Sequence, residues 1–269
     1  MSDIANKVET LMEAMPYLQK YQGKIIVIKY GGNAMINEEL KDAVMHDVVL
    51  LKLLGMKPVL SHGGGPGINK MLEKLDIPVE FIEGLRYTSA DIMRVVEMVL
   101  VGQVNTELVG FINKLGGKAV GLSGVSGDIY HCHQRDEVHG YVGDIDYVDP
   151  KPIFAMLDAG YIPVIAPVGT DGQGHTFNIN GDTAAGKLAS ALGAEKLVIL
   201  TDIEGLCNDI KIRDVISYLN IEDVKALKDK GTIAGGMIPK VDCCVQAIEE
   251  GVTSVNTVSY THLRAHETV

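Results

Sequence analysis

The chain has 269 residues, 46% of them hydrophobic and 22% charged, an ordinary composition for a globular protein of one large domain or two lobes. Its net charge of −11 argues against nucleic acid as the main ligand, because binding a phosphate backbone needs an electropositive surface. No apolar run approaches the roughly 18 residues of a membrane span, and the acidic N-terminus lacks the pattern of a signal peptide, so we expect a cytoplasmic protein with no membrane partner.

The hydrophobic pattern alternates between helical spacing and short β-branched runs. In chain order it predicts a helix over 2–20, a strand over 24–29, a helix over 38–55, a strand over 57–62, a helix over 68–75, a helix over 89–115, strands over 119–120, 129–133 and 141–148, a helix over 150–159, a strand over 161–166, a helix over 181–192, a strand over 196–202, and helices over 221–230 and 236–250. Strand, glycine turn and helix in succession are typical of βαβ units and a parallel sheet.

No linker, internal repeat or low-complexity segment divides the chain. We therefore predict one α/β unit with two lobes that share a continuous sheet. The predicted divisions are an N-terminal helix over 1–22, an N-lobe over 23–170, a C-lobe over 171–255 and an atypical tail over 256–269.

Three polar residues end predicted strands, where parallel sheets bind their ligands. They are Lys29, His62 and Asp202, and glycines follow each of them. A lysine that closes a buried strand either extends its amine to solvent or contacts an anion. The amides of Gly31 and Gly32 could face the same anion, which favours a phosphate contact.

Two further glycine clusters precede predicted helices. Residues 63–65 are glycines whose free amides could hold a phosphate or carboxylate. The alternative is a bare turn, but three consecutive glycines cost chain entropy unless a ligand or backbone approaches closely. Residues 235–236 precede Lys240 in the first turns of the last predicted helix. A lysine is disfavoured near a helix N-terminus, so it indicates an anionic partner unless the side chain is only solvated.

Several common site patterns do not fit. No GxGxxG follows a strand, and no GxSxG elbow is present. Residues 181–187 approach a P-loop, but Leu188 replaces the hydroxyl that would ligate magnesium. The pair His131 and His133 lacks a further metal ligand at matching spacing, and the four cysteines form no CxxC pair, which favours a reduced setting.

Taken together, these segments resemble the amino-acid kinase family, and within it the branch that phosphorylates N-acetyl-L-glutamate in the second step of arginine biosynthesis. The resemblance runs from about Val8 to about Val255. The matching stretches are residues 28–34, 61–66, 83–88, 95–102, 177–182, 201–205 and 235–240. It implies a three-layer αβα sandwich with a mainly parallel central sheet.

The resemblance also implies an enzyme that transfers a phosphoryl group from ATP, with Mg²⁺ held mainly by ATP and no protein metal ligand. By that resemblance Lys29 and Lys240 flank the transferring group, and Asp182 orients both lysines. The implied substrate-binding residues are Gly64, Gly65, Arg86 and Asn178. The implied nucleotide-binding residues are Gly31, Gly32, Thr201, Asp202 and Gly205.

The resemblance places acetylglutamate binding and oligomerisation in the N-lobe and ATP binding in the C-lobe. It predicts a homodimer, or a hexamer assembled through the N-terminal helix, with arginine as a possible effector. Residues 256–269 match nothing in the family, so we hypothesise that this tail is not native. The open alternatives are another amino-acid kinase, acting on aspartate or an aminoadipate derivative, and a non-catalytic nucleotide-binding regulatory subunit.

Overall fold

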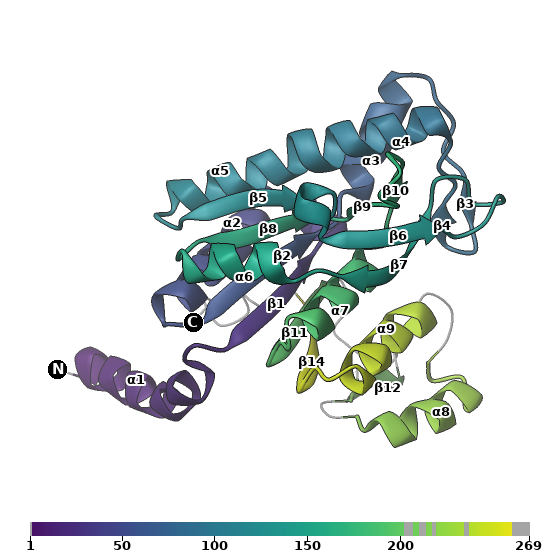
Figure 1. Ribbon diagram of the computed structural model, residues 1–269. Helices are drawn as coiled ribbons and strands as arrows, with labels where there is room; N and C mark the ends of the chain where they lie inside the picture. Colours follow the sequence, from purple (N-terminus) through teal and green to yellow (C-terminus); the bar gives the residue numbers. More distant parts are fainter. Residues whose placement is uncertain (1, 202–206, 210–213, 217–218, 234–236, 260–269) are drawn as a thin grey trace.

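A six-stranded parallel sheet forms the centre of the molecule (Figure 1). The computed structural model describes residues 2–201, 207–209, 214–216, 219–233 and 237–259. In spatial order the strands are β14 (Ser254–Ser259), β11 (Lys196–Thr201), β1 (Ile25–Tyr30), β2 (Lys57–His62), β8 (Ile162–Ala166) and β5 (Ala119–Ser123), all paired in parallel. The sheet therefore joins strands of both predicted lobes.

Helices cover both faces of this sheet, and alternate residues of β1 show which helices lie where. Ile26 and Ile28 belong to the apolar core under one set of helices, whereas Val27 belongs to the core on the other face. The first set is α2 (Glu38–Leu53), α3 (Gly65–Lys74), α4 (Ala90–Glu97) and α5 (Thr106–Lys114). The second set is α6 (Lys151–Asp158), α7 (Gly181–Ala191) and α9 (Met237–Glu249). The predicted three-layer αβα sandwich is confirmed.

Smaller elements surround the strand ends. A second sheet has the order β10 (Thr176–Asn178), β9 (Val168–Thr170), β6 (Tyr130–Gln134) and β7 (Gly143–Val148). Two-stranded ribbons are formed by β3 (Phe81–Ile82) with β4 (Leu85–Arg86), and by β12 (Cys207–Asp209) with β13 (Asp214–Val215). The remaining elements are α1 (Ser2–Tyr21), α8 (Ile221–Asp229), and the 3₁₀ turns η1 (Gly32–Met35) and η3 (Ser126–Asp128).

The hydrophobic pattern located the long elements and missed the short ones. It did not predict β3, β4, β9, β10, β12 or β13, which have two or three residues each and too few positions to show alternation. It also began α3 at residue 68, whereas the helix begins at Gly65, because glycine and proline at the first positions hid the helical spacing.

One long helix lies on the first face of the sheet and corrects the expectation about membrane-spanning segments. Residues Ala90–Lys114 are apolar and long enough to cross a membrane, with a mean hydropathy of 1.5 over 18 residues. The same helix packs against the sheet through residues such as Val96, Val99 and Leu108, which are 2% exposed or less. The apolar side chains of this helix are therefore explained by packing in the core of this fold.

The middle of that helix is η2 (Met98–Asn105), which has π-helical hydrogen bonding. Its last residue, Asn105, is 4% exposed and inserts between three strands. The Asn105 amide nitrogen lies 2.9 Å from the Val164 carbonyl, 3.2 Å from the Leu122 carbonyl and 3.0 Å from His62 Nε2. One side chain thus ties η2 to β8, β5 and β2.

We expect Asn105→Ala to lower the free energy of unfolding by about 3 kcal/mol, because it leaves buried acceptors without a donor. Asn113→Ala on the same helix is the control, since the Asn113 side chain accepts one exposed bond from the Ala119 amide. Urea unfolding of both variants measures the difference. Equal losses in the two variants would contradict the assigned role of Asn105.

Candidate active site

The carboxyl ends of the central strands bring a lysine and two glycine turns together. Lys29 lies on β1 and is 9% exposed. A Cβ atom at Gly31 would lie 3.2 Å from Lys29 Nζ and 3.6 Å from the Gly63 nitrogen. A Cβ atom at Gly181 would lie 3.8 Å from Lys29 Cε. Backbone at residues 31 and 181 therefore lies beside the Lys29 side chain, and a side chain at residue 31 would crowd its amine.

Asp182 links the two lysines that the sequence singled out. Its Oδ1 atom lies 2.8 Å from Lys29 Nζ, and its Oδ2 atom lies 3.3 Å from Lys240 Nζ. Burial raises the pKa of the Asp182 carboxyl, but the charges of the two lysines outweigh burial and hold the pKa below its usual range. The carboxylate is therefore ionised at neutral pH and forms ion pairs with both lysines, an arrangement suited to orienting them.

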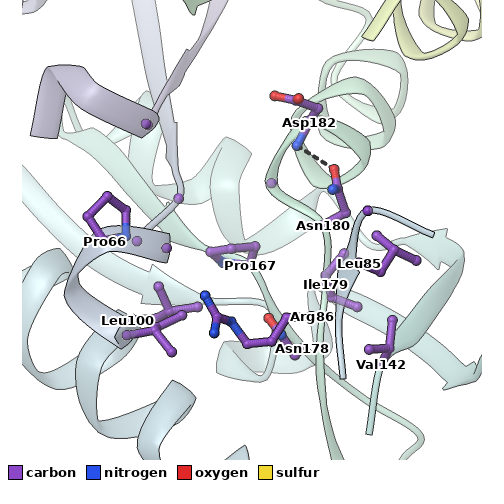
Figure 2. A pocket seen from close by; sticks show the side chains of 18 of the residues that line it. Pro66, Leu85, Arg86, Leu100, Val142, Pro167, Asn178, Ile179, Asn180 and Asp182 are labelled. Atoms are coloured by element: carbon purple, nitrogen blue, oxygen red, sulfur yellow. Dashed lines mark hydrogen bonds between the residues drawn. The ribbon is translucent and has the colours of Figure 1, made fainter. Parts of the chain in front are cut away.

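The start of α7 holds Asp182 in place. Asn180 caps this helix, and its side-chain oxygen accepts a bond from the Asp182 amide at 2.9 Å (Figure 2). The same oxygen accepts a bond from the Thr183 amide at 3.1 Å. Asp182 lies in the first helical turn, where a negative charge is favourable. Sequence reasoning did not assign Asn180, although an asparagine directly before Gly-Asp at a helix start is a recognisable capping signal.

A cavity of about 250 Å³ opens beside Lys29. Most of the residues assigned to substrate or phosphate binding line it, from four separate parts of the chain. They are Lys29, Gly31, Gly32, Gly64, Gly65, Arg86, Asn178 and Asp182. Figure 2 shows Asp182 and Asn180 on one side of this cavity and the Arg86 side chain extending toward Pro66 and Leu100 on the other.

Arg86 brings a cationic group into this cavity. It is 8% exposed, and burial lowers the pKa of its guanidinium. One terminal nitrogen donates to the side-chain oxygen of Asn69, while the buried Nη1 has no hydrogen-bond partner among the described residues. The Phe81 ring lies 4.9 Å from the guanidinium carbon. A buried guanidinium with an unused donor is well suited to a carboxylate ligand.

Asn178 lies next to Arg86 and is connected to it. The Asn178 amide donates to the Thr88 hydroxyl at 3.1 Å, and that hydroxyl donates to the Arg86 carbonyl at 2.9 Å. Thr88 has no exposed surface. This buried hydroxyl fixes the Asn178 amide relative to the arginine, and sequence reasoning missed it because a single threonine carries no pattern.

A second cavity of about 980 Å³ lies on the C-terminal part of the sheet. Thr201, at the end of β11, lines it together with Lys240 and Met237 at the start of α9. Since Lys240 also pairs with Asp182, the Lys29–Asp182–Lys240 cluster lies where the two cavities approach each other. Of the residues assigned to the nucleotide, Asp202 and Gly205 lie outside the described residues.

The sequence matches the model of the amino acid kinase family over residues 24–257. The acetylglutamate kinase of Heliobacterium modesticaldum is 50% identical, and the match covers 94% of this chain and 90% of that protein. The acetylglutamate kinase of Gloeobacter violaceus is 49% identical, with 97% and 88% covered.

Solved structures support the same fold at lower identity. An N-acetylglutamate synthase from Neisseria gonorrhoeae superposes with a TM-score of 0.82 at 23% identity, covering 94% of this chain and 58% of that one. A carbamate kinase from Giardia lamblia has a TM-score of 0.64 at 18% identity, covering 90% of this chain and 94% of that one. With one family model spanning most of the sequence and relatives near 50% identity, the chain belongs to the amino acid kinase family, and within it to the acetylglutamate kinases.

Proposed function

We propose that the chain transfers the γ-phosphoryl group of ATP to the side-chain carboxylate of N-acetyl-L-glutamate. A bond forms between a carboxylate oxygen and the γ-phosphorus, the bond to the β–γ bridging oxygen breaks, and ADP leaves. The observation that carries this proposal is the Asp182 carboxylate held between Lys29 and Lys240 where the two cavities approach each other. The relatives' names support acetylglutamate as the acceptor.

The first cavity suits the acceptor. Acetylglutamate carries two carboxylates and an acetamido group. Arg86 would bind the α-carboxylate through its unused guanidinium nitrogen, and Asn178 would bind beside it. The glycine amides at residues 64–65 line the same cavity and would face the reacting end. An attacking carboxylate is already ionised at neutral pH, so the site needs no general base.

The two lysines would supply the charge stabilisation. Phosphoryl transfer depends mainly on alignment and on neutralising the charge that develops on the phosphoryl oxygens and leaving group. Lys29 approaches from β1 and Lys240 from α9, so they would contact this charge from different sides. Asp182 fixes both amines before substrate arrives, which reduces the entropy lost on reaching the reactive geometry.

The second cavity suits the nucleotide, with Thr201 and Lys240 on its wall and Gly31 and Gly32 at the edge of the first cavity for the phosphates. Asp202 and Gly205 stay predictions for this site. Mg²⁺ would be held mainly by ATP oxygens, because it retains water and phosphate oxygens more readily than it takes a full set of protein ligands.

The finer expectations also stay proposals. We assign acetylglutamate binding to the N-lobe and ATP binding to the C-lobe, and a cytoplasmic setting to the protein. Helix α1 extends from the body of the molecule and exposes Val8, Met12, Met15 and Tyr17 (Figure 1). These apolar side chains support association of copies through α1, as a dimer or hexamer. Arginine as an effector follows from the sequence resemblance alone.

The function is tested by ADP release from purified protein with MgATP, with and without N-acetylglutamate. We expect release that depends on acetylglutamate and falls about 10²-fold to 10³-fold in Lys240→Ala, because a charge that stabilises the transferring group is lost. Lys187→Ala is the matched control, since Lys187 pairs with Glu250 outside the cluster.

Two outcomes would contradict this assignment. If a panel of aspartate, glutamate and aminoadipate derivatives supports turnover and acetylglutamate does not, the substrate is wrong. If the protein binds ATP but turns over no acid, the chain is a non-catalytic nucleotide-binding subunit.

Arg86→Lys separates substrate binding from chemistry. We expect the KM for acetylglutamate to rise about tenfold or more, because lysine keeps the charge but loses the fork that binds a carboxylate in two places. The KM for ATP should stay within about twofold. Arg94→Lys on α4 is the control, because the Arg94 side chain is 77% exposed and pairs only loosely with Asp91. Steady-state kinetics that show equal changes in both variants would remove Arg86 from the site.

A further inference from the structure

His62, which directly precedes the three glycines at residues 63–65, has two hydrogen-bond partners at its ring nitrogens. It is the last residue of β2 and has no exposed surface. Its Nδ1 atom lies 2.7 Å from the Gly63 carbonyl oxygen, and its Nε2 atom lies 3.0 Å from the Asn105 amide nitrogen. Neither the lysine cluster nor the arginine contacts explain why a histidine is buried here.

These partners fix which ring nitrogen carries the proton. The Gly63 carbonyl can only accept a hydrogen bond, so Nδ1 must carry a hydrogen. The Asn105 amide nitrogen also faces the carbonyls of Leu122 and Val164, so it is the donating NH₂ group. In a neutral ring protonated at Nδ1, the Nε2 atom that faces this NH₂ group is an acceptor. Burial lowers the pKa of His62 to about 4, against a raising effect of the bond to Gly63, so the ring is neutral at neutral pH.

The bond from Nδ1 sets the orientation of the next peptide unit. In a trans peptide the carbonyl of one residue and the N–H of the following residue point in opposite directions, and the structure has no cis peptide bonds among its described residues. With the Gly63 carbonyl turned onto His62, the Gly64 N–H points away from His62, and both glycines line the first cavity. The Gly63 N–H is engaged separately by the Tyr30 carbonyl at 2.8 Å.

We infer that His62 is a positioning residue for phosphoryl transfer, which aims the Gly64 N–H at the reacting group by holding the Gly63 carbonyl. Asn105 keeps His62 in the required tautomer. This inference rests on the proposed function for the identity of the reacting group, an anionic carboxylate or phosphoryl oxygen. His62 acts through the backbone and does not itself contact substrate.

Two substitutions test the hydrogen bond of each ring nitrogen separately. The amide of Asn can reach where Nδ1 lies, so His62→Asn keeps a donor for the Gly63 carbonyl and loses the bond from Asn105. The amide of Gln reaches toward Nε2, so His62→Gln keeps the bond from Asn105 and loses the donor to Gly63. Both variants place one buried amide in the same site, so a merely structural role predicts similar effects in the two.

We expect His62→Asn to keep kcat within about fivefold of the unsubstituted protein and His62→Gln to lower kcat about 10²-fold, the effect of losing one aligned donor. The KM for ATP should stay within about twofold in both, because the nucleotide cavity is lined by other residues. Equal kcat values in the two variants, or a loss confined to KM, would overturn the inference.

A measurement without turnover completes the test. In ¹⁵N spectra of the unsubstituted protein labelled at histidine, we expect the His62 ring to be protonated at Nδ1 and unprotonated at Nε2 at neutral pH. Protonation at Nε2 would overturn the inference even if either variant fails to fold. Absence of acetylglutamate-dependent ADP release in the unsubstituted protein would instead refute the proposed function and leave the tautomer result standing.

Discussion

The Asp182 carboxylate between two lysines is the interaction on which the arrangement of the site depends. Two ammonium groups drawn toward one point repel each other, and a buried lysine is costly without a partner of opposite charge. Lys29 comes from β1, Asp182 from α7 and Lys240 from α9, so the cluster also joins one strand of the sheet to two helices on its second face. The same contacts that stabilise this packing prepare the cations for an anionic ligand.

The position of the cluster follows from the parallel sheet. All six strands run the same way, so their carboxyl ends meet at one edge, and the turns that follow β1 and β2 must pass close to each other. Glycine at residue 31 favours that approach, because a Cβ atom there would lie 3.2 Å from Lys29 Nζ, whereas Cβ atoms at residues 63 and 181 would make ordinary contacts. The chain has a net charge of −11, yet it gathers two lysines and glycine backbone at one point, a local arrangement suited to an anion without a broad basic surface.

Much of this arrangement could be predicted from the sequence. Buried β-branched runs ending in Lys29 and His62, each followed by glycines, indicate strand ends that meet at one edge. The position of Lys240 near a helix start indicated an anionic partner. The family resemblance added Asp182, Arg86 and Asn178, and the described structure brings all four residues to one of two neighbouring cavities.

What could not be predicted depends on contacts between segments distant in sequence. The pairing of Arg86 with Asn69, the Thr88 hydroxyl under Asn178 and the amide of Asn105 against His62 each join segments between 17 and 90 residues apart. No periodicity records such contacts. The π-helical geometry of η2 was also hidden, because its apolar spacing is the same kind of signal that predicts an α-helix.

The π-helical segment η2 limits which insertions and deletions this protein can tolerate. A Cβ atom at Gly64 would collide with the Leu100 side chain unless that side chain moved, while Asn105, five positions later, contacts His62 at the end of β2. Inserting or deleting one residue between them would rotate one of these side chains away from its partner. The exposed positions of this helix, such as Met98 and Val101, are free to change in type, but its length is fixed by the loop that it covers.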